Sequence, residues 1–376
     1  QGQVEVEGTV MPARQALMTA GLEPLVLEPK EGLALLNGTQ MMAAIGALVL
    51  AGADRLARTA SVAAAISVEA LRGTVVAYSA AVQHTRPHPG QVRTAAELRW
   101  LLRESTIQTA HHGDDHRVQD PYSLRCAPQV HGAARDALDN LRRVLDIELN
   151  SATDNPLVFP EGGVAPEDTL ATGRGLVISG GNFHGEPIAL ALDYAKLAIA
   201  ELGSISERRV ALLLDPRLND GLPAFLGASS GLDSGLMILQ YTAAALASES
   251  KTLAHPASAD SIPTSANQED HVSMGSIAAR TAMRVLEHTE RIVAIELICA
   301  SQGLDLRLDL QPDTAPGSGV ADAHERVRSV IARLEQDREP GPDIEAAFRL
   351  VHDGSLVDLA DAPAGADTSW LGPDPR

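Results

Sequence analysis

The sequence is poor in aromatic residues and in cysteine, and its apolar runs are short. Phe, Trp and Tyr make up only 3% of the 376 residues, so the core must be aliphatic, which favours close helix packing over a β-sandwich. Two cysteines, Cys126 and Cys299, exclude a disulfide framework or a zinc ribbon and indicate a reducing, cytoplasmic setting. The longest apolar run, Met41–Ala53, is interrupted by glycine and is too short to span a membrane, and no signal peptide is visible.

Positive charge and the common catalytic motifs are also scarce. A formal net charge of −19 argues against nucleic acid and against an anionic membrane surface as partners. Gly180-Gly181 lacks the lysine of a phosphate loop, and Ala228–Gly231 is not a Gly-x-Ser-x-Gly elbow. His112 and His116 are four residues apart, but they lack the glutamate of H-E-x-x-H and a third ligand, so we predict no metal site.

Helix-forming segments dominate what remains. A chain of this length ordinarily forms two or three domains, and its Ala/Leu-rich patterns predict three to five long helices joined by polar loops, an all-α fold. Short apolar runs with Pro and Gly predict a hairpin-like excursion over residues 158–180, and the Pro/Gly/Asp-rich residues from Glu339 predict a tail. The predicted helices are 13–20, 40–71, 74–83, 92–104, 127–149, one that starts within 180–187 and ends near 214, 235–254, 272–302 and 319–334.

One polar stretch between two of these helices carries an amide, a phenol and a guanidinium at three-residue intervals. Gln119, Tyr122 and Arg125 would fall along one side of a helical turn. The planar fork of arginine suits a carboxylate, and a tyrosine hydroxyl can donate to it or exchange a proton. The spacing favours a pocket for a small amino or carboxylic acid, and the alternative is a surface turn with a salt-bridged arginine.

Three other polar segments are candidates with simpler alternatives. The loop Asn267–His271 combines amides, acids and an imidazole, which would bind a polar ring or cap the next helix. Phe183, between Asn182 and His184, would form a wall of a substrate pocket or pack at a helix start. Asn37, in the turn before the first long helix, would hold a carboxylate or an oxyanion, or serve as an N-cap.

Taken together, these segments resemble the aromatic amino acid ammonia-lyase family, and within it the histidine ammonia-lyase branch. The resemblance implies an all-α fold with a long central helix bundle of the ammonia-lyase and fumarase-like type, assembled as a homotetramer whose active sites draw on three subunits. It also implies a junction over 1–37, a helix-bundle core over 38–310, and C-terminal helices and tail over 311–376. The matching blocks are Lys30–Gln40, Val118–Gly132, Glu148–Pro156, Gly180–Pro187 and Ser258–Met274, with Asp337-Arg338 and Pro342–Ile344 in the tail.

The resemblance gives the first candidate group its roles. Arg125 is expected to clamp the substrate carboxylate, for which its fork geometry is suited. Tyr122 is expected to lie beside the family's electrophile, 4-methylideneimidazol-5-one (MIO), and to stabilise the charge that develops on it. Gln119 is expected to support this hydrogen-bond network.

The remaining roles concern the electrophile and the ring of the substrate. Asn37 is expected to donate to the carbonyl of the electrophile or to the substrate carboxylate, and Phe183 to line the ring pocket. Glu269 is expected to contact the imidazole of the substrate, because the phenylalanine and tyrosine branches carry an amide there. A carboxylate pairs with imidazolium and favours its charged form. Tyr122, Glu269 and Asn37 are therefore the predicted catalytic residues.

One departure from the family pattern limits what this chain is expected to do alone. The family forms MIO from an Ala-Ser-Gly tripeptide, which occurs nowhere in residues 1–376. In the family, that tripeptide and a loop with a catalytic tyrosine lie upstream of the segment that matches Gln1. The chain is thus expected to be the C-terminal two-thirds or more of such an enzyme, inactive without that segment or a separate N-terminal fragment.

The expected reaction is the conversion of L-histidine to trans-urocanate and ammonia, the first step of histidine degradation. It is expected in the cytoplasm, with MIO as cofactor and without a metal. The alternatives are a catalytically incomplete oligomeric scaffold and a tyrosine or phenylalanine ammonia-lyase. Lyases of the fumarase and argininosuccinate-lyase group share the long helices, but their Gly-Ser-Ser-x-Met-Pro loop is absent from this sequence.

Overall fold

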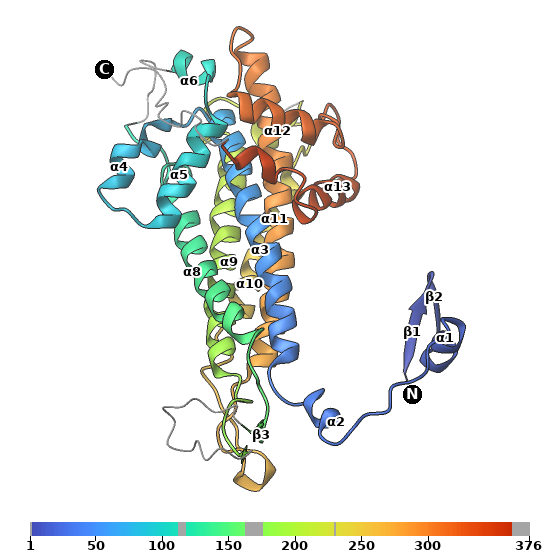
Figure 1. Cartoon of the computed structure of the whole chain (residues 1–376). Coiled ribbons are helices and arrows are strands. Elements are labelled where there is room, and N and C mark those ends of the chain that lie inside the picture. The colour runs from blue at the N-terminus through green and yellow to red at the C-terminus, as the bar shows by residue number, and fades with distance from the viewer. Residues whose placement is uncertain (1, 112–117, 162–175, 229–230, 363–376) are drawn as a thin grey trace. The chain divides into compact units, whose positions relative to one another are not determined.

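The computed structural model describes residues 2–111, 118–161, 176–228 and 231–362. The chain forms two compact units, which are described separately (Figure 1). The smaller unit comprises Gln1–Gly38 and Ala152–Phe183, and the larger comprises Thr39–Ser151 and His184–Arg376.

Long helices packed side by side form the larger unit, as the sequence predicts (Figure 1). The central helix α11 packs against α9 and α3, and α8 packs against α9. Their buried faces are almost entirely Ala, Leu, Val and Ile, which confirms the expected aliphatic core. Among the described residues five helices are long: α3 (Gln40–Ala70), α8 (Ala127–Glu148), α9 (Glu186–Leu214), α10 (Met237–Leu253) and α11 (Gly275–Leu310).

The helices α4, α5, α6, α12 and α13 surround one end of this bundle (Figure 1). The helix α5 crosses α8 so closely that a Cβ on Gly90 would lie 2.2 Å from the carbonyl oxygen of Gly132, so only glycine fits at this crossing. The shorter helices are η1 (Val75–Tyr78), α4 (Ala80–His84), α5 (Pro89–Leu101), α6 (Thr106–His111), α7 (Tyr122–Arg125), η2 (Ala224–Leu226), η3 (Ser265–Asn267), α12 (Ser318–Arg328), α13 (Gly341–His352) and η4 (Val357–Ala360).

Several predicted boundaries are wrong: α11 ends at Leu310 instead of 302, and α12 ends at Arg328 instead of 334. Residues 74–83 do not form one helix, because Thr74 caps η1 by accepting from the Val76 amide and Ser79 caps α4 in the same way. Ser and Thr at these positions start new helices instead of continuing an old one. The predicted tail contains α13, whose first turn holds a proline and Asp343; proline and an acidic residue are both favourable at a helix start.

The helix α3 is long and apolar enough to cross a membrane, judged by length and composition alone. The sequence did not predict this, because the apolar run Met41–Ala53 within it is short. Every residue from Thr59 to Ala70 is buried, and α3 packs against α8, α9 and α11. A helix that is apolar on most sides and covered by its neighbours is typical of a bundle core. We therefore identify α3 as a buried core helix.

The smaller unit contains two short antiparallel hairpins. The β3–β4 pair confirms the hairpin predicted within residues 158–180, with Leu157 opposite Ile178. The β1–β2 pair was not predicted; Glu7 and Gly8 form its turn, both at positive φ, as the twist of a tight hairpin requires. The elements are β1 (Gln3–Val6), β2 (Thr9–Pro12), α1 (Ala13–Thr19), α2 (Glu31–Ala34), β3 (Leu157–Phe159) and β4 (Leu176–Ile178).

A buried carboxyl group joins the end of α3 to the segment before α12. Both carboxyl oxygens of Glu69 accept from the Gly317 amide at 3.1 Å, and the side chain is fully buried. Burial raises the pKa of Glu69 to about 8, although hydrogen bonds from Ser105 and Gly317 oppose the shift. The folded chain therefore holds a proton on Glu69 that the unfolded chain releases above its ordinary pKa of 4.5.

Because the folded state binds the extra proton, the contribution of Glu69 to the free energy of unfolding is fully present below pH 4.5. It is lost as the pH rises toward 8. The slope for one proton is about 1.4 kcal/mol per pH unit. We expect the Glu69→Gln variant to lose this slope and to be more stable than the parent at pH 8. Denaturant unfolding at pH 5, 6, 7 and 8 measures it, with exposed Glu335→Gln as control. A stability difference independent of pH would contradict the assignment.

Candidate active site

The turn α7 and the residues just before it bring together Gln119, Tyr122 and Arg125, which the sequence predicts to lie on one side. The Arg125 Nη2 donates to the Gln119 Oε1 at 2.8 Å, and the guanidinium lies over the Tyr122 ring, 4.7 Å from its centroid. Arg125 Nε donates to the Asp120 carbonyl at 3.0 Å. The predicted grouping is confirmed, whereas the roles of these residues remain predictions.

The side chains of this turn are available to a ligand. Tyr122 is 72% exposed, and its hydroxyl has no hydrogen-bond partner among the described residues. Within the same part of the chain, no carboxylate forms a salt bridge with Arg125 and no group accepts from its Nη1. The alternative of a surface turn with a salt-bridged arginine is therefore disfavoured for this part of the chain, and one edge of the fork remains for a carboxylate.

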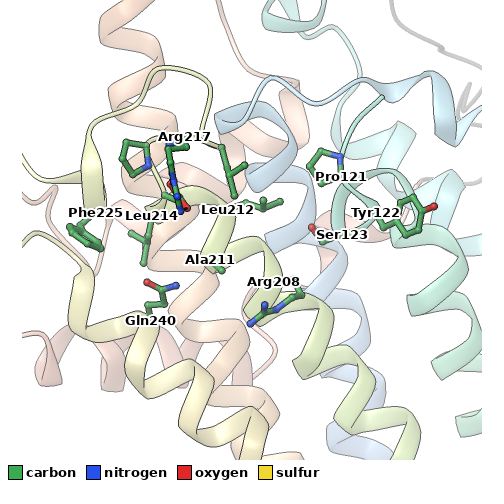
Figure 2. A pocket seen from close by; sticks show the side chains of 13 residues that line it. Pro121, Tyr122, Ser123, Arg208, Ala211, Leu212, Leu214, Arg217, Phe225 and Gln240 are labelled. Atoms are coloured by element: carbon green, nitrogen blue, oxygen red, sulfur yellow. Dashed lines mark hydrogen bonds and ion pairs between the residues drawn. The ribbon is translucent and has the colours of Figure 1, made fainter. Parts of the chain in front are cut away.

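A cavity of about 650 Å³ lies beside this turn. Figure 2 shows Tyr122 and Ser123 on one side of it and Arg217, Phe225 and Gln240 on the other. The volume is in the range of small-molecule sites, and its lining is largely apolar with a few polar groups, as such sites usually are.

The far wall of the cavity holds an ion pair that the sequence analysis overlooked. Arg217 Nη2 lies 2.6 Å from Asp215 Oδ2, and this hydrogen bond lowers the pKa of Asp215 to about 2. Arg208, on α9, also lines the cavity and pairs with Glu207. Residues 215–217 were predicted only to end a helix. An acidic and a basic residue two positions apart were the available signal for an ion pair.

Glu269 lies in a second polar loop, residues 255–271. Thr264 Oγ1 donates to Glu269 Oε2 at 2.7 Å, and the two residues also pair through their backbones. The Thr264 hydroxyl, and next the Ser265 hydroxyl, hold the pKa of Glu269 below its ordinary value. An exposed, charged carboxylate results.

This loop is built with strain and does not cap the next helix. Ser265, Ala266 and Asn267 all have positive φ, and such runs of non-glycine residues are costly and cluster at functional sites. The N-cap of α11 is Met274, whose side chain makes no cap hydrogen bond, and the Gly275 amide donates to the Ser273 hydroxyl at 3.3 Å. The capping alternative for Asn267–His271 is therefore wrong.

Two buried residues on α9, and His184 just before it, hold the loop in place. Asp193 Oδ2 accepts from the Ser258 amide and hydroxyl, both at 2.7 Å, and Asp193 also pairs with the fully buried Lys196. His184 Nε2 lies 3.1 Å from the His271 carbonyl oxygen. Asp193 and Lys196 were not predicted as functional residues, although two charged residues within an apolar helix pattern were a signal for them.

One group of imidazoles and an acid has the composition of a metal site. The ligand atoms of His184, Glu186 and His271 lie within 4.8 Å of one another. However, His184 Nε2 contacts the His271 carbonyl, and His184 Nδ1 accepts from the Glu186 amide at 3.3 Å. A metal ligand needs a free nitrogen lone pair, so this ring serves the loop. His112 and His116 lie outside the described residues.

The two parts of the larger unit that carry candidate residues lie far apart within one chain. Arg209, near the C-terminal end of α9, donates to the Ser123 carbonyl of the α7 turn. His184, just before the N-terminal end of α9, contacts His271. A rise of about 1.5 Å per residue separates Glu186 and Arg209 by roughly 35 Å along the helix axis. The α7 turn and Glu269 therefore lie toward opposite ends of the bundle.

Asn37 and Phe183 belong to the smaller unit, so their place in a common site stays a prediction. Asn37 follows α2, its amide donates to the Leu33 carbonyl at 2.9 Å, and its side chain is exposed. The N-cap position of α3 is Thr39, so the N-cap alternative for Asn37 is wrong. Phe183 is 41% exposed instead of packed into a core.

The larger unit is a bundle of long helices that carries the polar α7 turn and the polar loop of Glu269. The sequence profile of the family "Aromatic amino acid lyase" matches residues 1–329, and the chain belongs to this family. It is 52% identical over 347 residues to the histidine ammonia-lyase of Anaeromyxobacter dehalogenans (strain 2CP-C), covering 92% of this chain and 65% of that protein. The chain therefore spans about two thirds of the length of that relative.

Solved structures share the fold. The histidine ammonia-lyase of Trypanosoma cruzi superposes with a TM-score of 0.83 at 44% identity, over 96% of this chain and 65% of the other. The tyrosine aminomutase of Streptomyces globisporus superposes with the same TM-score, 0.83, at 36% identity, over 96% of this chain and 69% of the other. The expected all-α, long-helix architecture of the ammonia-lyases is confirmed.

Proposed function

We propose that this chain is part of an ammonia-lyase that converts L-histidine to trans-urocanate and ammonia. The observation that carries the proposal is the charged, exposed Glu269 carboxylate, which a polar basic ring would contact. The Arg125 fork, beside a Tyr122 hydroxyl that has no hydrogen-bond partner among the described residues, supplies the matching carboxylate site. The histidine ammonia-lyases at about half identity support the same substrate.

The chemistry follows from the charges on these residues. Arg125 holds the carboxylate of the amino acid, and Gln119 fixes the orientation of the guanidinium by accepting a hydrogen bond from it. Glu269, held ionised by Thr264, favours the imidazolium form of the ring. A charged ring withdraws electrons from the adjacent β-carbon, so its proton is lost more readily. Phe183 would line the ring pocket.

The MIO group fits the α7 turn by the character of its donors. The Tyr122 hydroxyl is exposed and has no partner in the part of the chain that the structure describes, so it can donate to a developing negative charge. Asn37 would offer a side-chain amide to the same group. When bound, MIO supplies the electrophile that makes the amino group a feasible leaving group.

The separation of the α7 turn from Glu269 supports an assembly of several copies. Roughly 35 Å along α9 is far longer than an amino acid, so Arg125 and Glu269 would contact one substrate only if they come from different chains. The exposed stripe Leu190, Tyr194 and Leu197 on α9 offers an apolar surface for such an assembly. We propose a homotetramer with shared sites, in the cytoplasm, to which a separate N-terminal fragment could add the missing tripeptide.

The test uses the complete protein, including a segment with Ala-Ser-Gly, and measures urocanate and ammonia released from L-histidine. We expect equal amounts of both products and little turnover of L-tyrosine or L-phenylalanine. The Glu269→Gln variant should lose about 10²-fold in kcat/KM for L-histidine, because an ion pair is lost. The neighbouring exposed acid gives the control Asp270→Asn. Preferred turnover of tyrosine or phenylalanine, or none at all, would contradict the proposal.

A further inference from the structure

A fully buried ion pair lies directly beneath the α7 turn. Arg209 on α9 and Glu296 on α11 have no exposed side-chain surface. Their two parallel hydrogen bonds measure 2.5 Å from Nε to Oε1 and 2.8 Å from Nη2 to Oε2. Ser67 and Ser206 also donate to Glu296, at 2.7 and 2.6 Å. The guanidinium plane is thereby fixed in one orientation.

The third nitrogen of this guanidinium points at the turn. Arg209 Nη1 donates to the Ser123 carbonyl at 3.3 Å and lies 3.5 Å from His131 Nε2. Burial, and then the charge of Arg209, hold the pKa of His131 well below its ordinary value. A neutral His131 can therefore accept from Arg209 and leaves the guanidinium aimed at the Ser123 carbonyl.

The next carbonyl of the turn is held from another direction. The fully buried Tyr78 donates its hydroxyl to the Leu124 carbonyl at 2.8 Å. The turn entrance is held as well, because Asp120 Oδ2 accepts from the Thr74 amide at 2.7 Å. The two carbonyls between Tyr122 and Arg125 are thus each bonded to a buried donor.

Stability alone is a weak reason for this arrangement. A buried ion pair often contributes little beyond what apolar residues of the same volume would, since desolvation offsets the attraction. What apolar residues cannot do is direct a donor at a backbone carbonyl. The pair is placed to stabilise α7. This turn has only four residues and is too short to keep its geometry by its own hydrogen bonds.

We propose that Arg209, oriented by Glu296, and Tyr78 are positioning residues that fix the directions in which Tyr122 and Arg125 project. The inference rests on the proposed function only for its catalytic consequence. A carboxylate clamp displaced by about 1 Å can cost roughly 10²-fold in rate. Loss of a positioning residue should therefore weaken the binding of ligands that contact Arg125 and leave the binding of other ligands unchanged.

The experiment compares L-histidine with histamine, which has the same ring and amine but no carboxylate. In the complete enzyme we expect Arg209→Met to lower kcat/KM for L-histidine about 10- to 100-fold. Inhibition by histamine should change less than about twofold, because its contacts do not involve the clamp. Tyr78→Phe, which removes only one hydroxyl, should lower kcat/KM by about three- to tenfold.

A matched control exists in the same bundle. Arg135 forms a buried, two-bond pair with Glu97, both bonds at 2.6 Å, and within the described part of the chain it makes no hydrogen bond to the α7 turn. Arg135→Met should lower the thermal midpoint comparably and leave the ratio of histidine to histamine affinity unchanged. Equal ratios in the Arg209→Met, Tyr78→Phe and Arg135→Met variants would overturn the proposal. If Arg209→Met does not fold, Tyr78→Phe decides.

A second readout separates this inference from the proposed reaction. If the parent enzyme releases no urocanate, the proposed function fails, and hydrogen exchange of the amides of residues 119–126 tests the positioning. Faster exchange of these amides in Tyr78→Phe than in Arg135→Met would show that the buried donors hold the turn in position. Exchange as slow as in the control would overturn it.

Discussion

Replacing Arg125 with alanine is expected to lower kcat/KM for L-histidine by about 10³-fold, because two charge-assisted hydrogen bonds to a carboxylate are lost. The Nη1 edge of this guanidinium has no acceptor within the described residues, whereas Nε and Nη2 are held by Asp120 and Gln119. Steady-state kinetics of the complete enzyme measure the loss, which should be mainly in KM.

Arg125→Lys separates charge from geometry. Lysine keeps the positive charge but lacks the planar fork, so we expect a loss intermediate between the parent and the alanine variant. Histamine, without a carboxylate, should inhibit all three proteins about equally. An alanine variant with near-parental KM for L-histidine would show that Arg125 does not hold the carboxylate.

The second large effect is expected from Tyr122→Phe, which removes one hydroxyl and nothing else. If this hydroxyl stabilises charge that develops during the reaction, kcat should fall by about 10²- to 10³-fold with little change in KM. The side chain is 72% exposed, so the fold should not be affected. Rates at saturating L-histidine measure the effect.

The control for this variant is Tyr241→Phe, since Tyr241 is also an exposed tyrosine, at 64%, on α10. It should retain parental kcat and thermal midpoint. A Tyr122→Phe enzyme with parental kcat, or one whose defect lies only in KM, would remove Tyr122 from the catalytic residues.

Local features of the fold and site were predictable because they depend on residues near in sequence. The long helices follow from runs of helix formers, and α8 and α10 end within a few residues of the predicted positions. Gln119, Tyr122 and Arg125 gather because three-residue spacing brings side chains together on one turn. The start of α13 was missed because proline and glycine were taken as signs of a tail.

The parts that could not be predicted depend on packing between distant segments. Arg209 and Ser123 are 86 residues apart in sequence, and Arg209 and Glu296 are 87 apart. Nothing in the local pattern around Arg209 indicates which carbonyl its guanidinium will reach. The same holds for Asp193, whose partner Ser258 is 65 residues away. The opposite placement of the α7 turn and Glu269 follows only from the contacts of Arg209 with Ser123 and of Asp193 with Ser258, which lies in the loop of Glu269.

The central claim is that Arg125 and Glu269 hold the two ends of one histidine molecule, although they lie at opposite ends of a single chain's bundle. A crystal structure of the complete enzyme with urocanate bound tests it most directly. We predict the ligand carboxylate within hydrogen-bond distance of the Arg125 guanidinium. We also predict an imidazole nitrogen on a Glu269 carboxylate from a different copy of the chain. A ligand bound with its ring away from every Glu269, or with its carboxylate away from Arg125, would contradict the account.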